Sequence, residues 1–268
     1  MSALQALVLG FVQGLTEFLP ISSSGHLILV PALLGWPAQG LGFDAAVHLG
    51  TALALLSWFG RDLLGLGRGT LAGRAADVRL GVAVVAGSIP AGLAGLLLEH
   101  AIERRLRGAP VVALSLIGWG LVLWWADRQA ARARVRELRE VGIARSLAIG
   151  CAQAIALIPG TSRSGITISA GLFAGLDRPT AARFAFLLGL PITAAAGLLR
   201  TATLLRAGPG PGEAAALGLG LLASFAAGLA AVWFLLRYLQ RRTLSVFVVY
   251  RVALGLLILW LFWGRAAA

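Results

Sequence analysis

Two short segments of the chain place hydroxyl side chains beside one acidic or one basic residue, within sequence that is otherwise apolar. The first is QGLTEFLPISSSGHL (13–27) and the second is PGTSRSGIT (159–167). Carboxylates, hydroxyls, imidazoles and guanidinium groups supply the nucleophiles, bases and phosphate-binding donors of proteins. The two segments are therefore the candidate functional regions of the chain.

Glu17 follows Gln13 by four residues on a predicted helix, so the two side chains share one helix face. A carboxylate at membrane depth costs roughly 2.5–3.5 kcal/mol, and we expect Glu17 to have a partner or a bound cation. The alternative is a structural Glu that is hydrogen-bonded between helices. The functional interpretation is favoured by the polar residues that follow within nine positions: Ser22, Ser23, Ser24 and His26.

The serines follow a helix break at Pro20, after which the chain should restart as a half-helix with Ser22 or Ser23 as its N-cap. Free backbone N–H groups at such a helix start form an anion site, which suits a phosphate group. His26 lies one turn inside this half-helix and can reach the same cavity. A structural, hydrogen-bonded His is the alternative, and the neighbouring acid and serines favour a functional one.

Arg163 supplies the opposite charge in the second segment. Its guanidinium offers a planar fork of donors that matches phosphate oxygens. Its alternative role is an internal ion pair with Glu17, and the two roles are compatible if substrate displaces the pair. The polar neighbours that we expect to bind phosphate with it are Thr161, Ser162, Ser164 and Thr167.

The composition identifies a membrane protein. Of 268 residues, 59% are hydrophobic and 13% are charged, against about 25% charged in an average soluble domain. The net charge of +12 comes from Arg residues in short segments between apolar stretches, which favours anionic lipid headgroups and argues against nucleic acid. Cys151 is the only cysteine, so an intramolecular disulfide is excluded. The apolar N-terminus lacks a basic n-region and is expected to remain in the mature protein.

Six apolar segments are long enough to cross a bilayer, and the predicted fold is all-α. The predicted spans are 44–60, 81–98, 109–126, 184–204, 214–236 and 246–263. Two further apolar regions, 1–34 and 143–176, are each interrupted by Pro, Gly and hydroxyl residues. Backbone that leaves the helix at membrane depth must line a polar cavity or be buried in protein. We therefore expect two re-entrant helical hairpins beside the six spans.

The two broken regions also resemble each other. GFVQGL (10–15) and SSSG (22–25) are matched 140 residues later by GCAQAI (150–155) and SRSG (162–165). This offset predicts one membrane domain over 1–268, with one repeat at about 1–126 and a second at about 143–264. Most loop Arg residues fall on one side of the predicted spans, which the positive-inside rule makes cytoplasmic. Both termini then face outward, the repeats are inverted, and the hairpin tips meet near the midplane.

The residues 13–27 resemble the acidic motif of the undecaprenyl-diphosphatase family, and PGTSRSGIT (159–167) resembles the second motif of that family. The resemblance covers essentially the whole chain. It implies hydrolysis of undecaprenyl pyrophosphate to undecaprenyl phosphate and inorganic phosphate, with a divalent cation such as Mg²⁺ or Ca²⁺. The chain departs from some members at Gln13, where they have Glu, so a metal site formed by Gln13 and Glu17 has one carboxylate fewer.

The resemblance implies a catalytic set of Glu17, Ser23, His26 and Arg163. The nucleophile is either His26, through a phosphohistidine, or Ser23 with His26 as its base. The expected location is the bacterial inner membrane, with an active site that opens to the periplasmic side and a polyprenyl pyrophosphate lipid as substrate. Two questions stay open at this point: whether the chain is instead a lipid-carrier or small-anion transporter or flippase, and whether it forms an oligomer such as a homodimer.

Overall fold

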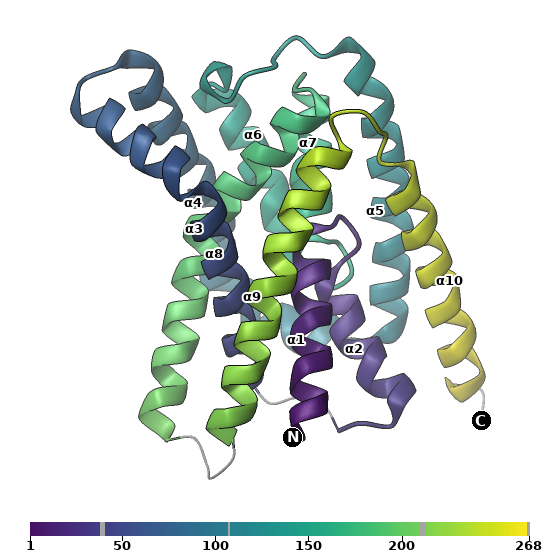
Figure 1. The fold of residues 1–268 in the computed structure, drawn as a ribbon. Helices are drawn as coiled ribbons and strands as arrows, with labels where there is room; N and C mark the ends of the chain where they lie inside the picture. The colour runs from purple at the N-terminus through teal and green to yellow at the C-terminus, as the bar shows by residue number, and fades with distance from the viewer. Residues whose placement is uncertain (38–40, 107, 209–212, 267–268) are drawn as a thin grey trace.

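The computed structural model describes residues 1–37, 41–106, 108–208 and 213–266, and within them every long element is a helix (Figure 1). Three short 3-10 turns, at Ala130–Arg132, Leu138–Glu140 and Ile155–Leu157, lie between the α-helices. In chain order the helices are α1 (Ala3–Phe18), α2 (Ser23–Leu34), α3 (Leu41–Leu71), α4 (Ala75–Leu106), α5 (Ala109–Gln129), α6 (Ile143–Ala154), α7 (Arg163–Phe173), α8 (Arg178–Ala207), α9 (Glu213–Tyr238) and α10 (Ser245–Ala266).

The six predicted spans are confirmed as the six long apolar helices α3, α4, α5, α8, α9 and α10. Their outer surfaces expose large apolar side chains, with Leu96 81% exposed and Trp260 74% exposed. Exposed apolar surface of this extent is typical of helices that face lipid rather than water. The described part of the chain is therefore a multi-pass helical membrane protein.

Helices α3 and α4 are longer than the sequence pattern indicated. The loop expected between residues 60 and 81 is reduced to the turn at 72–74, where Gly73 has a positive φ of 70°. Arg61, Arg68 and Arg79 consequently lie on helices and not in a loop. Ala, Leu and Arg are all good helix formers, so the helix continues past the end of the apolar stretch. The joined ends of α3 and α4 project from the top left of the bundle (Figure 1).

Both predicted helix breaks are present, and each separates two short helices. α1 and α2 have 16 and 12 residues, and α6 and α7 have 12 and 11. In Figure 1 the pair α1 and α2 occupies the lower half of the bundle, with the N-terminus at the bottom, whereas α6 and α7 lie in the upper half. The two breaks therefore face each other inside the ring of long helices.

The first short helix of each pair, α1 or α6, packs closely against a long helix of the other half of the chain. α1 packs along α9, and a Cβ added to Gly10 would overlap the carbonyl oxygen of Gly220. α6 packs along α4, and a Cβ added to Gly150 would overlap the carbonyl oxygen of Gly87. Small residues let helix backbones approach each other in membrane proteins. Gly10 and Gly150 are 140 residues apart, so α1 and α6 make the same kind of close glycine contact at equivalent positions.

An aromatic cluster anchors the end of α1 next to the break. Phe18 packs edge-to-face on Phe186 with ring centroids 5.5 Å apart, and Phe59 meets the same ring at 6.4 Å. Phe18 and Phe59 are each 1% exposed. Packing on this scale holds the backbone of Glu17, the preceding residue, in a fixed position between α3 and α8.

Candidate active site

The backbone at both breaks adopts the same unusual conformation. Ser22 has a φ of 74° and Ser162 a φ of 70°, and they are the non-Gly residues with positive φ in the described part of the chain. Each is the N-cap of the short helix that follows, α2 or α7. Residues held in sparsely populated backbone regions cluster at functional sites, where the surrounding structure must enforce them. The two breaks are thus built alike, at positions 140 residues apart.

Hydrogen bonds join the two breaks directly. The Ser24 hydroxyl accepts from the Gly160 backbone N–H at 3.2 Å, and the Ser164 hydroxyl donates to the Leu19 carbonyl at 3.1 Å. Within each break, Ser22 and Ser24 share a hydrogen bond of 3.2 Å, and Ser162 and Ser164 share another of 3.2 Å. The two helix breaks, which we expected to lie close together, are therefore in direct contact.

Glu17 is the centre of the polar cluster between the tips. Its Oε1 accepts from Arg163 Nη2 at 2.8 Å, and its Oε2 accepts from Ser23 Oγ at 2.7 Å and from Gln13 Nε2 at 3.0 Å. The Glu17 side chain is 8% exposed and that of Arg163 is 22% exposed. Each charge thus compensates the other in a largely dry environment, as a buried carboxylate requires.

Arg163 is held on its other side by α8. Its Nη1 donates to the Gly189 carbonyl at 3.2 Å and to the Thr193 hydroxyl. The guanidinium therefore lies between Glu17 of the first hairpin and the wall formed by α8. Because contacts on both sides hold the guanidinium, its orientation is fixed before an anion binds.

A cavity of about 270 Å³ opens beside this ion pair. Its apolar walls include Ala91, Leu157 and Ile192. The polar side chains that line it come from both hairpins and from two long helices: Glu17, Ser22, Ser23, Ser24, Gln153, Ser162, Arg163, His48 on α3 and Thr193 on α8. A space of this size that combines a carboxylate, an arginine, hydroxyls and two helix starts suits a phosphorylated headgroup.

Comparison with known proteins agrees with this geometry over nearly the full chain. The family model described as bacitracin resistance protein BacA matches residues 6–257. The chain belongs to this family. It is 47% identical to the undecaprenyl-diphosphatase of Thermomicrobium roseum, covering 97% of this chain and 98% of that one. It is also 47% identical to undecaprenyl-diphosphatase 2 of Stutzerimonas stutzeri (98% and 100%) and 48% identical to the undecaprenyl-diphosphatase of Geobacter sulfurreducens (95% and 96%).

His26, the imidazole singled out from the family motif, is buried beside the cavity and is not among the side chains that line it. Its Nδ1 lies 2.7 Å from the Ser22 carbonyl, so Nδ1 carries the proton and donates. Its Nε2 then accepts from the Tyr250 hydroxyl at 2.6 Å, and the two rings stack with centroids 5.6 Å apart. His26 therefore holds the strained backbone of Ser22 in place.

The other residues expected to bind phosphate divide into two groups. Ser22, Ser24 and Ser162 line the cavity. The remaining three, Thr161, Ser164 and Thr167, are buried and are not among the lining side chains. Thr167 donates to the Arg163 carbonyl at 2.7 Å, which makes it part of the support of helix α7.

Arg251 is a deeply buried residue that the sequence motifs did not include. It is 0% exposed, and its guanidinium donates to carbonyls of both breaks, namely Pro20 at 3.3 Å, Gly160 at 3.1 Å and Thr161 at 2.9 Å. It also donates to carbonyls of α5, at Ser115 and Leu116. The available signal was an arginine inside a predicted span, which marks a functional or packed position in membrane proteins.

The residues around Glu17 suit a divalent cation only in part. No group of three or more His, Cys, Asp or Glu side chains that could hold a metal occurs among the described residues. Gln13 is fully buried, its amide N–H supports Glu17, and its Oε1 has no hydrogen-bond partner. Mg²⁺ is usually bound through one or two carboxylates together with substrate phosphates and water. One carboxylate from Glu17 therefore fits a cation that phosphate oxygens and water help to hold.

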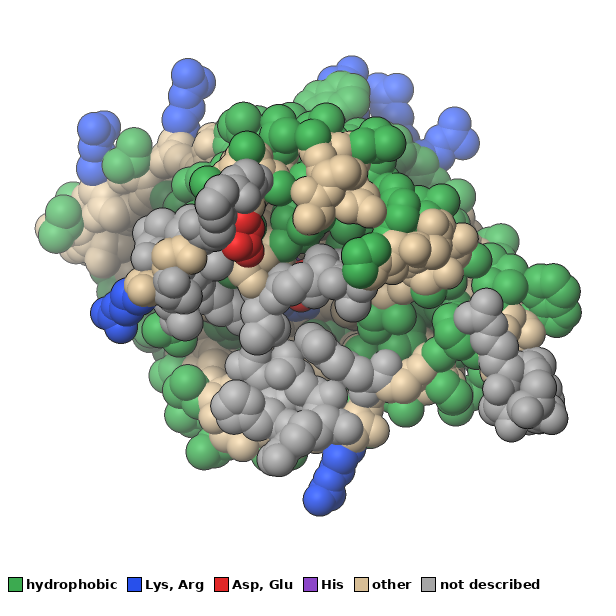
Figure 2. All heavy atoms as spheres, turned by 90° about the horizontal axis from the view of Figure 1, so that it is seen from below, with side chains coloured by type: hydrophobic (Ala, Val, Ile, Leu, Met, Phe, Trp, Pro, Cys, Tyr) green, Lys and Arg blue, Asp and Glu red, His purple; other side chains and the backbone are tan. Residues whose placement is uncertain are grey.

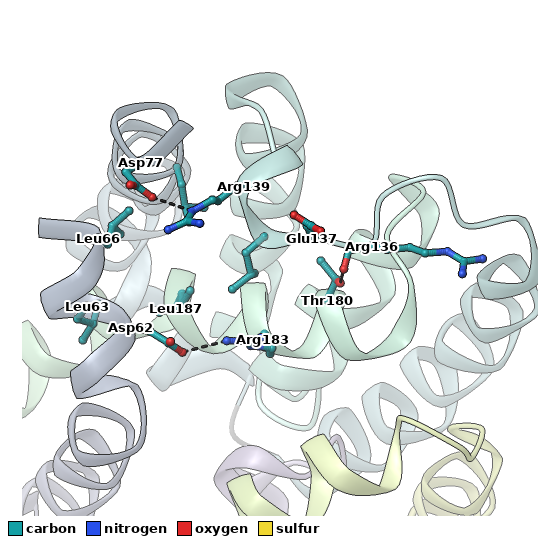
Figure 3. A pocket seen from close by; sticks show the side chains of 12 residues that line it. Asp62, Leu63, Leu66, Asp77, Arg136, Glu137, Arg139, Thr180, Arg183 and Leu187 are labelled. Atoms are coloured by element: carbon teal, nitrogen blue, oxygen red, sulfur yellow. Dashed lines mark hydrogen bonds and ion pairs between the residues drawn. The ribbon is translucent and has the colours of Figure 1, made fainter. Parts of the chain in front are cut away.

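A larger cavity, of about 350 Å³, lies elsewhere in the bundle and contains none of the predicted site residues. It is formed between the α3–α4 projection, residues 136–139 and α8 (Figure 3). Two ion pairs span it, Asp77 with Arg139 at 2.8 Å and Asp62 with Arg183 at 2.9 Å. Because four of its six charged side chains are paired with each other and none of the motif residues lines it, the smaller cavity around Glu17 is the better candidate for the chemistry.

Proposed function

We propose that the cavity around Glu17, Ser23 and Arg163 is the active site in which this chain hydrolyses undecaprenyl pyrophosphate to undecaprenyl phosphate and inorganic phosphate. The observation that carries this proposal is the contact of one carboxylate with both a hydroxyl and a guanidinium, at 2.7 and 2.8 Å. A phosphoryl transfer needs a nucleophile, an acceptor for its proton and positive charge on the phosphoryl oxygens. Ser23, Glu17 and Arg163 supply these in that order.

Ser23 is the proposed nucleophile. Its hydroxyl proton already points at Glu17, so the carboxylate takes that proton as Oγ attacks the terminal phosphorus. The bond to the bridging oxygen breaks, and undecaprenyl phosphate leaves with the bond electrons. Water then attacks the phosphoserine, and Glu17 returns its proton to Ser23 Oγ as the bond from Oγ to phosphorus breaks. Inorganic phosphate leaves with the oxygen and protons of the water, and the Ser23 hydroxyl and the Glu17 carboxylate are restored. The phosphohistidine alternative is less favoured because both ring nitrogens of His26 are engaged, with Ser22 and Tyr250.

Arg163 and the helix starts supply the positive charge. α2 begins at Ser23 and α7 begins at Arg163, so the first backbone N–H groups of both helices lie at the cavity. The partial positive charge of a helix start favours a phosphate there. Arg163 must exchange part of its contact with Glu17 for phosphate oxygens when substrate binds.

A divalent cation, Mg²⁺ or Ca²⁺, is proposed to bind at Glu17 together with the substrate, with Gln13 behind the carboxylate. When bound it would neutralise negative charge on the pyrophosphate oxygens. Glu17 and Gln13 contribute one carboxylate and one otherwise unpartnered amide oxygen to this region.

The proposed membrane topology has two inverted repeats, with α1–α2 and α6–α7 as re-entrant hairpins from opposite sides. The exchange of packing partners supports it, because α1 packs on α9 and α6 on α4, as a two-fold relation between the halves requires. Among the described residues, the bundle end that carries the N-terminus shows mainly hydrophobic and uncharged side chains, with an acidic group left of centre and basic groups at the margin of the view (Figure 2). This end is proposed to face the periplasm of the inner membrane, with the substrate headgroup entering from there.

Phosphate release by the purified protein tests the function. We expect inorganic phosphate from undecaprenyl pyrophosphate in detergent, and a phosphoserine at residue 23 in rapidly quenched reactions with lipid labelled at the terminal phosphate. Ser23→Ala should abolish both signals. Binding of the lipid without phosphate release would instead support a carrier. Label on His26, or turnover by Ser23→Ala near the wild-type rate, would refute the assigned nucleophile.

A further inference from the structure

Gln153 is a buried amide that faces the active-site cavity without a partner. It lies on α6, it is 3% exposed, and its side chain lines the cavity. Neither its Nε2 nor its Oε1 has a hydrogen-bond partner within the described structure. Buried polar groups are almost always hydrogen-bonded, because an unsatisfied group loses its contacts with water and gains nothing in return. An amide without a hydrogen-bond partner in the wall of a substrate cavity is available to bind a ligand.

The repeat explains why this amide is left unsatisfied. Gln153 lies 140 residues after Gln13, and both occupy the helix that precedes a break. Gln13 donates its Nε2–H to Glu17, which follows it by one helical turn. The corresponding position after Gln153 is Leu157, which has no acceptor and also lines the cavity. The second hairpin thus has the amide but lacks the carboxylate that would accept its hydrogen bond.

We propose that Gln153 is a further substrate-binding residue, whose Nε2–H donates to a phosphate oxygen of the bound pyrophosphate. This rests on the proposed function of the cavity. A phosphate oxygen offers only acceptor positions, so it is the donor end of the amide that pairs with it. Glu17 and Arg163 approach the headgroup from one side, and Gln153 contributes from the α6 wall. A neutral donor binds the anion without competing with Arg163 for Glu17.

The test uses two variants with a matched control, in purified protein with wild type alongside. Gln153→Leu keeps the approximate size of the side chain and removes the amide. The control is Thr201→Val on α8. It likewise removes a buried polar group without a hydrogen-bond partner, here a hydroxyl, but Thr201 does not line the cavity. Each protein is measured for its thermal unfolding midpoint without substrate and for kcat/KM with undecaprenyl pyrophosphate. If wild type itself releases no phosphate, the proposed function fails and not this inference.

Gln153→Leu should lower kcat/KM roughly 10- to 100-fold, the effect of losing a hydrogen bond to a charged group. Its thermal midpoint should stay equal or rise, because an unsatisfied buried amide has been replaced by an apolar group. Thr201→Val should match wild type in activity. A Gln153→Leu variant with kcat/KM within twofold of wild type overturns the proposal. A lower midpoint, or failure to fold, overturns it as well, since the amide then has a structural partner.

Gln153→Glu distinguishes a phosphate contact from a cation contact. A carboxylate at this position repels the pyrophosphate, so KM for the lipid should rise at least as much as in Gln153→Leu. A Glu variant that instead keeps its KM for the lipid and needs less Mg²⁺ for half-maximal rate would show that the side chain binds the cation through oxygen. That result would refute donation to phosphate.

Discussion

Replacing Arg163 by Ala removes the cation that compensates Glu17 and that, in the proposed mechanism, binds the substrate, so stability and catalysis should fall together. Breaking a buried ion pair costs roughly 3–5 kcal/mol, since the remaining charge is left uncompensated. Because the Arg163 side chain is 22% exposed, we expect the free energy of unfolding to fall by about 3 kcal/mol, the lower end of that range. Ser23 and Gln13 still donate to Glu17 and limit the loss further.

The expected catalytic loss follows from the proposed contact of Arg163 with the phosphoryl oxygens. Removing one preorganised donor from a transition state costs roughly 2.7–4 kcal/mol, which corresponds to about 100- to 1,000-fold in rate. Arg163→Lys keeps the charge but cannot contact Glu17, Gly189 and the substrate with one planar fork. We expect Lys to retain a small fraction of wild-type activity and Ala almost none.

The assay must separate the loss of stability from the loss of catalysis. Phosphate release from undecaprenyl pyrophosphate gives kcat/KM, and thermal unfolding in detergent shows whether the variant is folded. In a Glu17→Gln background, Arg163→Ala should cost less stability than in wild type, because no buried carboxylate is left uncompensated. If folded Arg163→Ala hydrolyses the lipid within a few-fold of wild type, the phosphate site has been placed wrongly.

Three further predictions follow from the site and from the topology. Glu17→Gln should abolish phosphate release with any cation, whereas Gln13→Glu should be tolerated and should lower the Mg²⁺ concentration for half-maximal rate; full activity of Glu17→Gln in a metal titration would remove the acid from the mechanism. Arg251→Met leaves buried carbonyls of both breaks without a donor and should lower the thermal midpoint markedly, and Arg251→Lys should not restore it, because three donors cannot serve carbonyls spread over five residues. Single cysteines at Ala75 and Ala131, in a cysteine-free background, should react with an impermeant reagent only after the membrane is opened, and labelling in intact cells would invert the assigned orientation.

Hydropathy and breaker residues were sufficient to predict the helices and the two interruptions. A bilayer leaves few alternatives to long apolar helices, and Pro and Gly cannot continue a helix without cost. The ends of α3 and α4 were predicted less well. Charged residues such as Arg61 and Arg68 end an apolar stretch, but they do not end a helix. The turn at Gly73 is the actual boundary.

The part of the site that lies in the two matching segments could be predicted from the sequence. The 140-residue offset led us to expect that the two breaks meet. The ion pair of Glu17 with Arg163, which was the alternative role considered for Arg163, is present at 2.8 Å. His48, Gln153 and Arg251 were not predicted as site or support residues. Their roles depend on which wall of the cavity their helices form, and a single sequence does not contain that information. An arginine inside a span, such as Arg251, is nevertheless a signal that sequence reasoning can use.

The two helix breaks share one backbone conformation but carry different side chains. Both copies bend at a serine with positive φ and start a short helix at the cavity. At equivalent positions, however, Ser23 is matched by Arg163 and Glu17 is matched by Leu157. Identical copies would place two carboxylates or two guanidinium groups together, and like charges at close range disfavour each other's ionised form. In the proposed mechanism this difference gives the first segment the nucleophile and its base and gives the second segment the phosphate-binding cation, so that both segments are needed for the reaction.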